Sequence, residues 1–238
     1  MLTGTTLKTA LQALLPTQQI RTCTPMAQQG HSNQSYLLTT DRERYFLRLF
    51  EPSSINRGSE YQIQQLAHSV GIAPKPVAVD IDQGIMLSAF VQGTHTQTLT
   101  PPQLAQLAQT LLRLHTLPPE GASTTFQVDT AIIQDFTYEP VLCHNDLNPQ
   151  NILWERNTPI LIDWEYAGIN DRYFDLAAVI NEFGLKDTEK QRLLHLYFKE
   201  ADVCNQKKLD AYIRLYRDVC AQWWRDHAIE PPSSTARS

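Results

Sequence analysis

The sequence has few of the features that mark a nucleic-acid-binding, secreted or membrane-spanning protein. Its 238 residues contain 20 Lys and Arg against 25 Asp and Glu, and its largest basic cluster is the pair Lys207-Lys208. A protein that follows a phosphate backbone usually presents a basic face. The composition therefore argues against nucleic acids and anionic membrane surfaces as partners.

Paired cysteines and long apolar runs are also missing. The four cysteines (Cys23, Cys143, Cys204 and Cys220) form no C-x-x-C pair, which argues against a zinc knuckle, a redox motif or a disulfide framework. We find no signal peptide at the N-terminus, and no apolar run approaches the roughly 18 residues of a membrane span. We expect reduced thiols in a soluble, cytoplasmic protein.

The pattern of apolar residues divides the chain into two parts. Residues 1–92 combine helical patterns, a short one at 7–15 and another at 57–69, with several β-prone runs. Residues 93–238 are mainly helical, with helices expected at 101–115, 173–184, 188–200 and 206–229 and two short strands near 152–154 and 160–162. The order predicts an α+β fold with a small antiparallel-sheet N-lobe and a mainly helical C-lobe.

One segment carries the strongest chemical signal. The run His144-Asn145-Asp146-Leu147-Asn148-Pro149-Gln150-Asn151 has the form H-x-D-x-x-x-x-N, and Asp163 follows twelve residues later in Ile162-Asp163-Trp164-Glu165. Phosphoryl transfer needs an Asp to orient the attacking hydroxyl, and Mg²⁺ prefers oxygen ligands such as an Asn carbonyl and an Asp carboxylate. The alternative is a set of ordinary turn and capping residues. For His144 alone, we favour a structural role in bracing the loop.

These residues resemble a known family. The two motifs, with the continuation Tyr166-Ala167-Gly168 and Phe174-Asp175-Leu176-Ala177, are similar to the aminoglycoside phosphotransferase/choline kinase superfamily, above all to its choline/ethanolamine kinase and thiamine kinase branches. The resemblance implies a protein-kinase-like fold, with 1–92 as the nucleotide-binding lobe and 93–238 as the lobe with the catalytic loop. It also implies ATP and Mg²⁺ as cofactors, Asp146 as the catalytic base, and Asn151 and Asp163 as metal ligands.

The N-terminal part supports the resemblance with two weaker signals. The segment Gly30-His31-Ser32-Asn33 resembles the family's phosphate-covering loop, although Gln29 stands where a Gly is common. Arg48, inside an apolar strand, needs a partner, and Glu60 on the following helix is the natural one. The resemblance then implies that the nucleotide is bound by Ser32, Asn33, Arg48, Glu60 and Asn148. An ordinary turn at 30–33 and a solvent-facing Arg48 are the alternatives.

The acceptor is expected to be a small-molecule alcohol, and a choline-like acceptor would carry a positive charge. Only eight residues separate Asp163 from Arg172, which leaves no room for the activation loop of a protein kinase. The resemblance implies that the substrate is contacted by Glu165, Glu182, Trp223 and Trp224. Choline or ethanolamine, thiamine, and other alcohols or amino sugars stay open. The 28 residues between His115 and His144 are fewer than in many family members, which leaves the shape of the acceptor pocket open.

Two other classes of function compete with a kinase. A catalytically silent kinase-like module would bind a nucleotide or ligand without turnover. A metal-dependent hydrolase would need several His or carboxylate ligands, and the seven His form no H-x-H or H-x-x-x-H cluster. The oligomeric state and the pathway cannot be read from the sequence.

Overall fold

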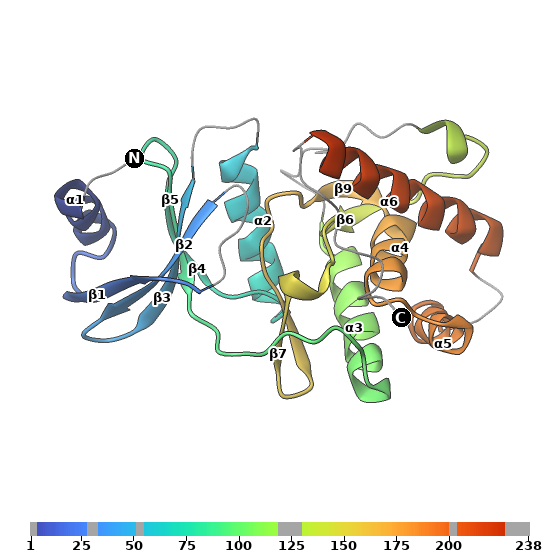
Figure 1. Cartoon of the computed structure of the whole chain (residues 1–238), viewed down its shortest axis with the longest axis horizontal. Coiled ribbons are helices and arrows are strands. Elements are labelled where there is room, and N and C mark those ends of the chain that lie inside the picture. Colours follow the sequence, from blue (N-terminus) through green and yellow to red (C-terminus); the bar gives the residue numbers. More distant parts are fainter. Residues whose placement is uncertain (1–3, 28–32, 51–54, 119–129, 200–203, 227–238) are drawn as a thin grey trace. The chain divides into compact units, whose positions relative to one another are not determined.

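The computed structural model describes residues 4–27, 33–50, 55–118, 130–199 and 204–226. The chain divides into two compact units, Met1–Gln92 and Gly93–Ser238. The first contains a five-stranded sheet with two helices, and the second is mainly helical (Figure 1). The α+β kinase-like fold predicted from the sequence is confirmed.

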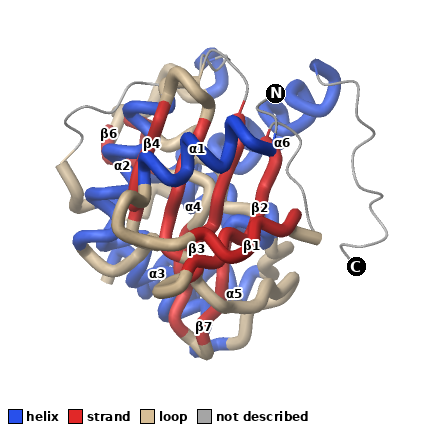
Figure 2. The backbone as a smooth tube through the Cα atoms, turned by 90° about the vertical axis from the view of Figure 1, so that its left-hand side faces the viewer, coloured by secondary structure: helices blue, strands red, loops and turns tan. Residues whose placement is uncertain are grey.

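The sheet of the first unit is antiparallel throughout, with the order β1-β2-β3-β5-β4. Its elements are α1 (Gly4–Leu14), β1 (Ile20–Pro25), β2 (Asn33–Thr40), β3 (Arg44–Phe50), α2 (Arg57–Ser69), β4 (Pro76–Asp80) and β5 (Ile85–Ala89). Figure 2 shows α1 crossing one face of this sheet. The predicted helix at 57–69 is confirmed as α2, whose N-cap Asn56 accepts a hydrogen bond from the backbone amide of Ser59.

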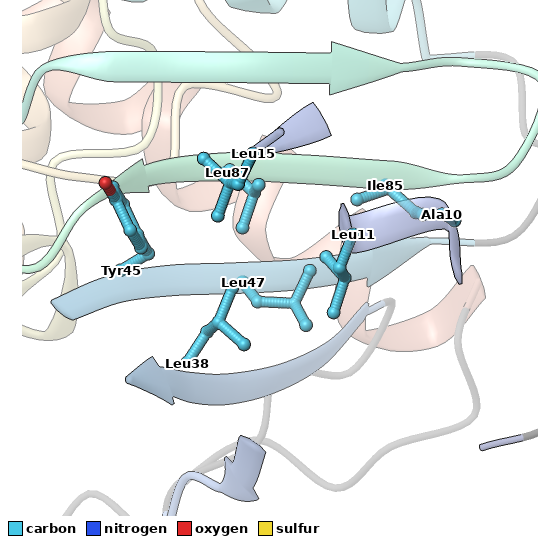
Figure 3. Close-up of a cluster of buried hydrophobic side chains, with 8 residues drawn as sticks. All are labelled: Ala10, Leu11, Leu15, Leu38, Tyr45, Leu47, Ile85 and Leu87. Carbon is cyan, nitrogen blue, oxygen red and sulfur yellow. The ribbon is translucent and has the colours of Figure 1, made fainter. Parts of the chain in front are cut away.

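The two faces of β3 have different environments. Tyr45 and Leu47 belong to a buried cluster that α1 completes with Leu11 and its neighbours (Figure 3). Because side chains alternate along a strand, Arg48 lies on the opposite face from Leu47. There its guanidinium contacts Glu60 of α2. The fold therefore buries apolar residues on one side of β3 and presents a charged pair on the other.

Among its described residues, the second unit contains four α-helices and two short antiparallel strand pairs. The helices are α3 (Pro101–His115), α4 (Arg172–Glu182), α5 (Asp187–Phe198) and α6 (Gln206–Asp226). The strand pairs are β6 (Pro140–Cys143) with β9 (Gly168–Asp171), and β7 (Ile152–Glu155) with β8 (Thr158–Leu161). Cys143, the last residue of β6, pairs with Gly168, the first residue of β9. This pairing brings the start of the first motif, at His144, next to the end of the second motif.

Helix α6 is fixed to the rest of this unit by a buried lysine. Lys208 is 2% exposed, and its Nζ lies 2.7 Å from Oδ2 of Asp171 and 2.9 Å from Oε1 of Glu139. The ammonium also lies 4.5 Å from the ring centre of Tyr173. A buried lysine is stable only when its charge is compensated, and here a fully buried carboxylate and an aromatic face provide that compensation.

The sequence prediction missed three strands. It placed two short strands in the second unit, whereas the structure adds β6 and β9, and it did not identify β1 in the first. The predicted helices at 101–115, 173–184 and 188–200 correspond to α3, α4 and α5; α6 corresponds to the fourth and is described as far as Asp226. Among the described residues, no helix is long and apolar enough to cross a membrane.

Candidate active site

The carboxylate of Asp146 is held by two asparagines of its own loop. Asn148 Nδ2 donates to Oδ1 at 2.9 Å, and Asn151 Nδ2 donates to Oδ2 at 2.6 Å. Asn151 also donates to the Asp146 carbonyl oxygen at 2.9 Å. A one-turn 3-10 helix, Pro149–Asn151, begins after Asn148 and brings Asn151 back toward Asp146. The short spacing of the motif thus folds two asparagine side chains around one carboxylate.

His144 braces this loop, as the sequence analysis expected. Its ring is buried, with Nε2 3.0 Å from the carbonyl oxygen of Ile162, while Nδ1 accepts the backbone N–H of Asp146 at 3.3 Å. These contacts require a neutral ring protonated on Nε2. Burial lowers the pKa of His144, which favours the same neutral form. This contact joins the loop around Asp146 to Ile162, the residue before Asp163.

A second carboxylate, that of Asp175 on α4, holds the backbone on the other side of Asp146. Oδ2 accepts the His144 amide and Oδ1 accepts the Asn145 amide, each at 2.9 Å, and Oδ2 also lies 3.1 Å from His115 Nε2. Burial alone would raise the pKa of Asp175, but His115 and the amide of His144 outweigh it and lower the pKa. Asp175 is thus an ionised anchor for the two peptides that precede Asp146.

Asp146 lies in an anionic environment. Burial, together with the nearby charges of Asp163 and Glu165, raises the pKa of Asp146 to about 7, although the hydrogen bonds from Asn148 and Asn151 oppose the rise. Glu165 is itself 8% exposed. Negative charges that raise the pKa of Asp146 also attract a cation, and the Asn151 amide and Asp163 carboxylate offer the oxygen donors that Mg²⁺ prefers.

The first unit contains a four-residue polar cluster that was only half predicted. Arg48 pairs with Oε1 of Glu60, as expected, and Arg57 Nη1 donates to Oε2 of the same carboxylate at 2.8 Å. Arg57 Nη2 also donates to Oδ1 of Asn33 at 3.1 Å. Arg57 was missed, although its position three residues before Glu60 on a helix was an available signal. Ser32 lies outside the described residues.

The residues expected to contact the acceptor fall into two contacting groups. Tyr216 on α6 donates to Oε1 of Glu182 on α4 at 3.2 Å, and Trp223 Nε1 donates to the Tyr166 hydroxyl at 3.3 Å. Trp224 packs edge-on against Trp223 at 4.9 Å between ring centres. The pKa of Tyr216 is raised well above its usual value by burial, with further contributions from Cys220, Glu182 and Asp146. Tyr166, which accepts from Trp223, was not predicted from the sequence, and the charge of Asp146 contributes to raising the pKa of both tyrosines.

One further group of possible metal ligands has a structural role. Nε2 of His115, Sγ of Cys143 and a carboxylate oxygen of Asp175 lie within 4.8 Å of one another, all buried. Both ring nitrogens of His115 are already engaged, Nε2 with Asp175 and Nδ1 with the Tyr197 hydroxyl at 2.6 Å. Asp175 in turn accepts the amides of the catalytic loop. These contacts make the group part of the loop's support, not the centre of a metal-dependent hydrolase.

The fold and the motif geometry together define a kinase-like phosphotransferase class of protein. The family model described as "Phosphotransferase enzyme family" (APH) matches residues 26–132 and 124–204. This match covers more than half of the chain, and the chain belongs to that family.

Individual relatives agree with the family assignment. Protein LicA from Haemophilus influenzae is 28% identical over 216 residues, which cover 74% of this chain and 61% of the relative's length. The crystal structure of choline kinase LicA from Streptococcus pneumoniae superposes with a TM-score of 0.76 at 21% identity, covering 96% of this chain and 92% of that one. Ethanolamine kinase from Plasmodium vivax gives a TM-score of 0.70 at 15% identity, covering 93% and 82%. At these identities, the two solved structures show likeness of fold.

Proposed function

We propose that this protein transfers the γ-phosphate of ATP to a hydroxyl group of a small molecule. The observation that carries the proposal is the catalytic loop, in which Asn148 and Asn151 fix the two oxygens of Asp146 while Asp163 and Glu165 lie near. A carboxylate held in this way can accept a proton from an alcohol and orient it for attack. Membership of the phosphotransferase family supports this chemistry.

Each polar group then has a definite task. Asp146 orients the acceptor hydroxyl and takes its proton. Asn151 and Asp163 would hold Mg²⁺, which neutralises charge on the phosphates when it is bound. In the N-terminal unit, Ser32, Asn33, Arg48 and Glu60 would contribute to holding the triphosphate, and in the catalytic loop Asn148 would contribute as well as holding Asp146. Complexes with AMP and with ADP among the similar solved structures support the nucleotide assignment.

For the acceptor, we infer a choline- or ethanolamine-like alcohol, with thiamine as the second candidate. Glu182 with Tyr216, and Trp223 with Tyr166, combine acidic and aromatic side chains, which is the composition that attracts an organic cation. Glu165 and Trp224 extend the same composition. The printed functions of two structural neighbours, a choline kinase and an ethanolamine kinase, support this acceptor class.

The test is ADP release from Mg-ATP with choline, ethanolamine, thiamine and a set of amino sugars as acceptors. We expect turnover with one acceptor class and its loss, by at least a hundredfold, in Asp146→Asn. Asp210→Asn is the matched control, because Asp210 lies in a half-exposed ion pair with Lys190 on the protein surface. It should keep wild-type turnover. A wild-type protein that binds ATP but shows no acceptor-dependent turnover would instead indicate a silent binding module.

A further inference from the structure

Arg57 joins the Arg48–Glu60 pair to the first residue of β2. Its guanidinium is forked, with Nη1 donating to Glu60 and Nη2 donating to Asn33. Each oxygen of the Glu60 carboxylate therefore has a different partner: Oε1 contacts Arg48 and Oε2 contacts Arg57. Three elements, β2, β3 and α2, meet through these four side chains.

The geometry of this cluster depends on an arginine. The side chain of Arg57 is 4% exposed and its guanidinium carbon lies 4.7 Å from the ring centre of Phe50, so the group is held against an aromatic face. A guanidinium presents several donors in one rigid plane, whereas a lysine presents a single ammonium. A lysine at position 57 would reach Glu60 or Asn33 but would not hold both in the same way.

The position of Asn33 connects the Arg57–Asn33 contact to nucleotide binding. Asn33 begins β2, directly after the segment proposed to cover the phosphates of the nucleotide. Arg48 and Arg57 bring two cationic groups to one Glu60, and cationic groups are the ones that bind phosphate oxygens. Because Arg57 contacts both Asn33 and Glu60, it fixes Asn33 relative to the Arg48–Glu60 pair.

We propose that Arg57 is a positioning residue for the polyphosphate of a nucleoside triphosphate, acting through Asn33 and Glu60. The proposal rests on the nucleotide-binding role assigned above and adds a residue to it. Arg57 orients Asn33 with one nitrogen and Glu60, hence Arg48, with the other. Its removal should weaken the hold on the phosphates and leave recognition of the nucleoside unchanged.

The experiment measures binding of a non-hydrolysable ATP analogue and of adenosine to the full chain by calorimetry. We expect Arg57→Gln to weaken the triphosphate about tenfold, as for the loss of one charged hydrogen bond, and to leave adenosine unchanged. Arg57→Lys should lose less. The control is Arg44→Gln, because Arg44 is an exposed arginine at the start of the same β3 strand, packed over Phe90. It should bind both ligands as the wild type does.

A double-mutant cycle tests the route through Asn33. If Arg57 acts through Asn33, then Asn33→Ala and Arg57→Gln should each weaken the triphosphate, and the double variant should be little worse than either. Additive losses, equal losses for adenosine and triphosphate, or a lowered melting temperature with unchanged triphosphate affinity would each overturn the proposal. If Arg57→Gln does not fold, Arg57→Lys and Asn33→Ala decide the same question. Absence of acceptor turnover in the wild type would count against the kinase assignment, while this binding comparison would still be decisive.

Discussion

Replacing Asp175 by Asn tests how the catalytic loop is held. The side chains have nearly the same shape, but the amide loses the negative charge and presents an N–H₂ group where an oxygen stood. In the native structure both carboxylate oxygens accept hydrogen bonds, from the amides of His144 and Asn145 and from His115. In Asp175→Asn at least one of these donors faces another donor.

The magnitude follows from the number and kind of these bonds. A hydrogen bond to a charged group contributes about 1.5–3 kcal/mol, and a buried donor left without an acceptor costs about 1–3 kcal/mol. We expect Asp175→Asn to lower the free energy of unfolding by about 2–4 kcal/mol, measured by urea denaturation at pH 7. Since the two anchored peptides directly precede Asp146, kcat should also fall by at least tenfold in the folded variant, with a smaller effect on the KM for ATP.

The surface variant Asp210→Asn is again the control, and it should change the unfolding free energy by less than about 1 kcal/mol. If Asp175→Asn were no more destabilising than this control, the anchoring role would be wrong. A large loss of stability with an unchanged kcat would show that the geometry of Asp146 does not depend on Asp175.

Two further predictions concern buried charges. Lys208→Met should lower the unfolding free energy by about 3 kcal/mol in urea denaturation, because it leaves buried Asp171 without its cation, whereas Lys190→Met in the half-exposed pair should cost under about 1 kcal/mol. Asp146→Asn loses hydrogen bonds from Asn148 and Asn151, but relative to the wild type it should gain stability as pH rises, since the folded pKa of Asp146, about 7, lies above its unfolded value of about 4. Wild-type stability contributed by this group is lost as pH rises through that window, so the gain measured by urea denaturation should be larger at pH 8 than at pH 5.

Similar stabilities for the two lysine variants would contradict the first of these predictions. For the second, a gain from Asp146→Asn that is equal at pH 5 and pH 8, or larger at pH 5, would show that Asp146 is not strained by burial and neighbouring carboxylates. Comparing each variant with the wild type at each pH removes the contribution of other titrating groups.

The helices could be predicted from the sequence because apolar residues recur in them at helical spacing, and α3 also has a clear signal at its start. Thr100 and Gln103 form a capping box at the start of α3, beside Pro101. The three missed strands lack the corresponding signal. In β1 the side chains are almost all exposed, and β9 reads Gly-Ile-Asn-Asp. Such strands are stabilised by backbone hydrogen bonds to a partner strand, β2 for β1 and the distant β6 for β9, and patterns of side chains do not reveal these bonds.

The residues of the candidate site also differ in how well the sequence predicted them. Asp146, Asn148 and Asn151 lie within one short loop, so their spacing alone indicated that they act together. Asp175 contacts that loop from a later helix, and its position in an apolar helical run was the only local sign of a buried role. Arg57 was missed for another reason, because Glu60 alone accounts for the charge of Arg48, although its carboxylate has a second oxygen that can bind a second cation.

Backbone conformation, as well as chemistry, explains which residue types the two motifs contain. Asn145, immediately before Asp146, has a φ of 67°, and Asp163 has a φ of 61°. Among residues other than glycine, Asn and Asp adopt this left-handed conformation with the least strain. At both positions the side chain therefore tolerates the backbone conformation and also makes a contact. The Asn145 side-chain amide donates to the Tyr166 carbonyl oxygen, and Asp163 supplies a carboxylate whose charge affects Asp146. An alanine at position 163 would remove the charge and strain the turn together, whereas Asn removes the charge alone, so only Asp163→Asn can separate the chemical role from the structural one.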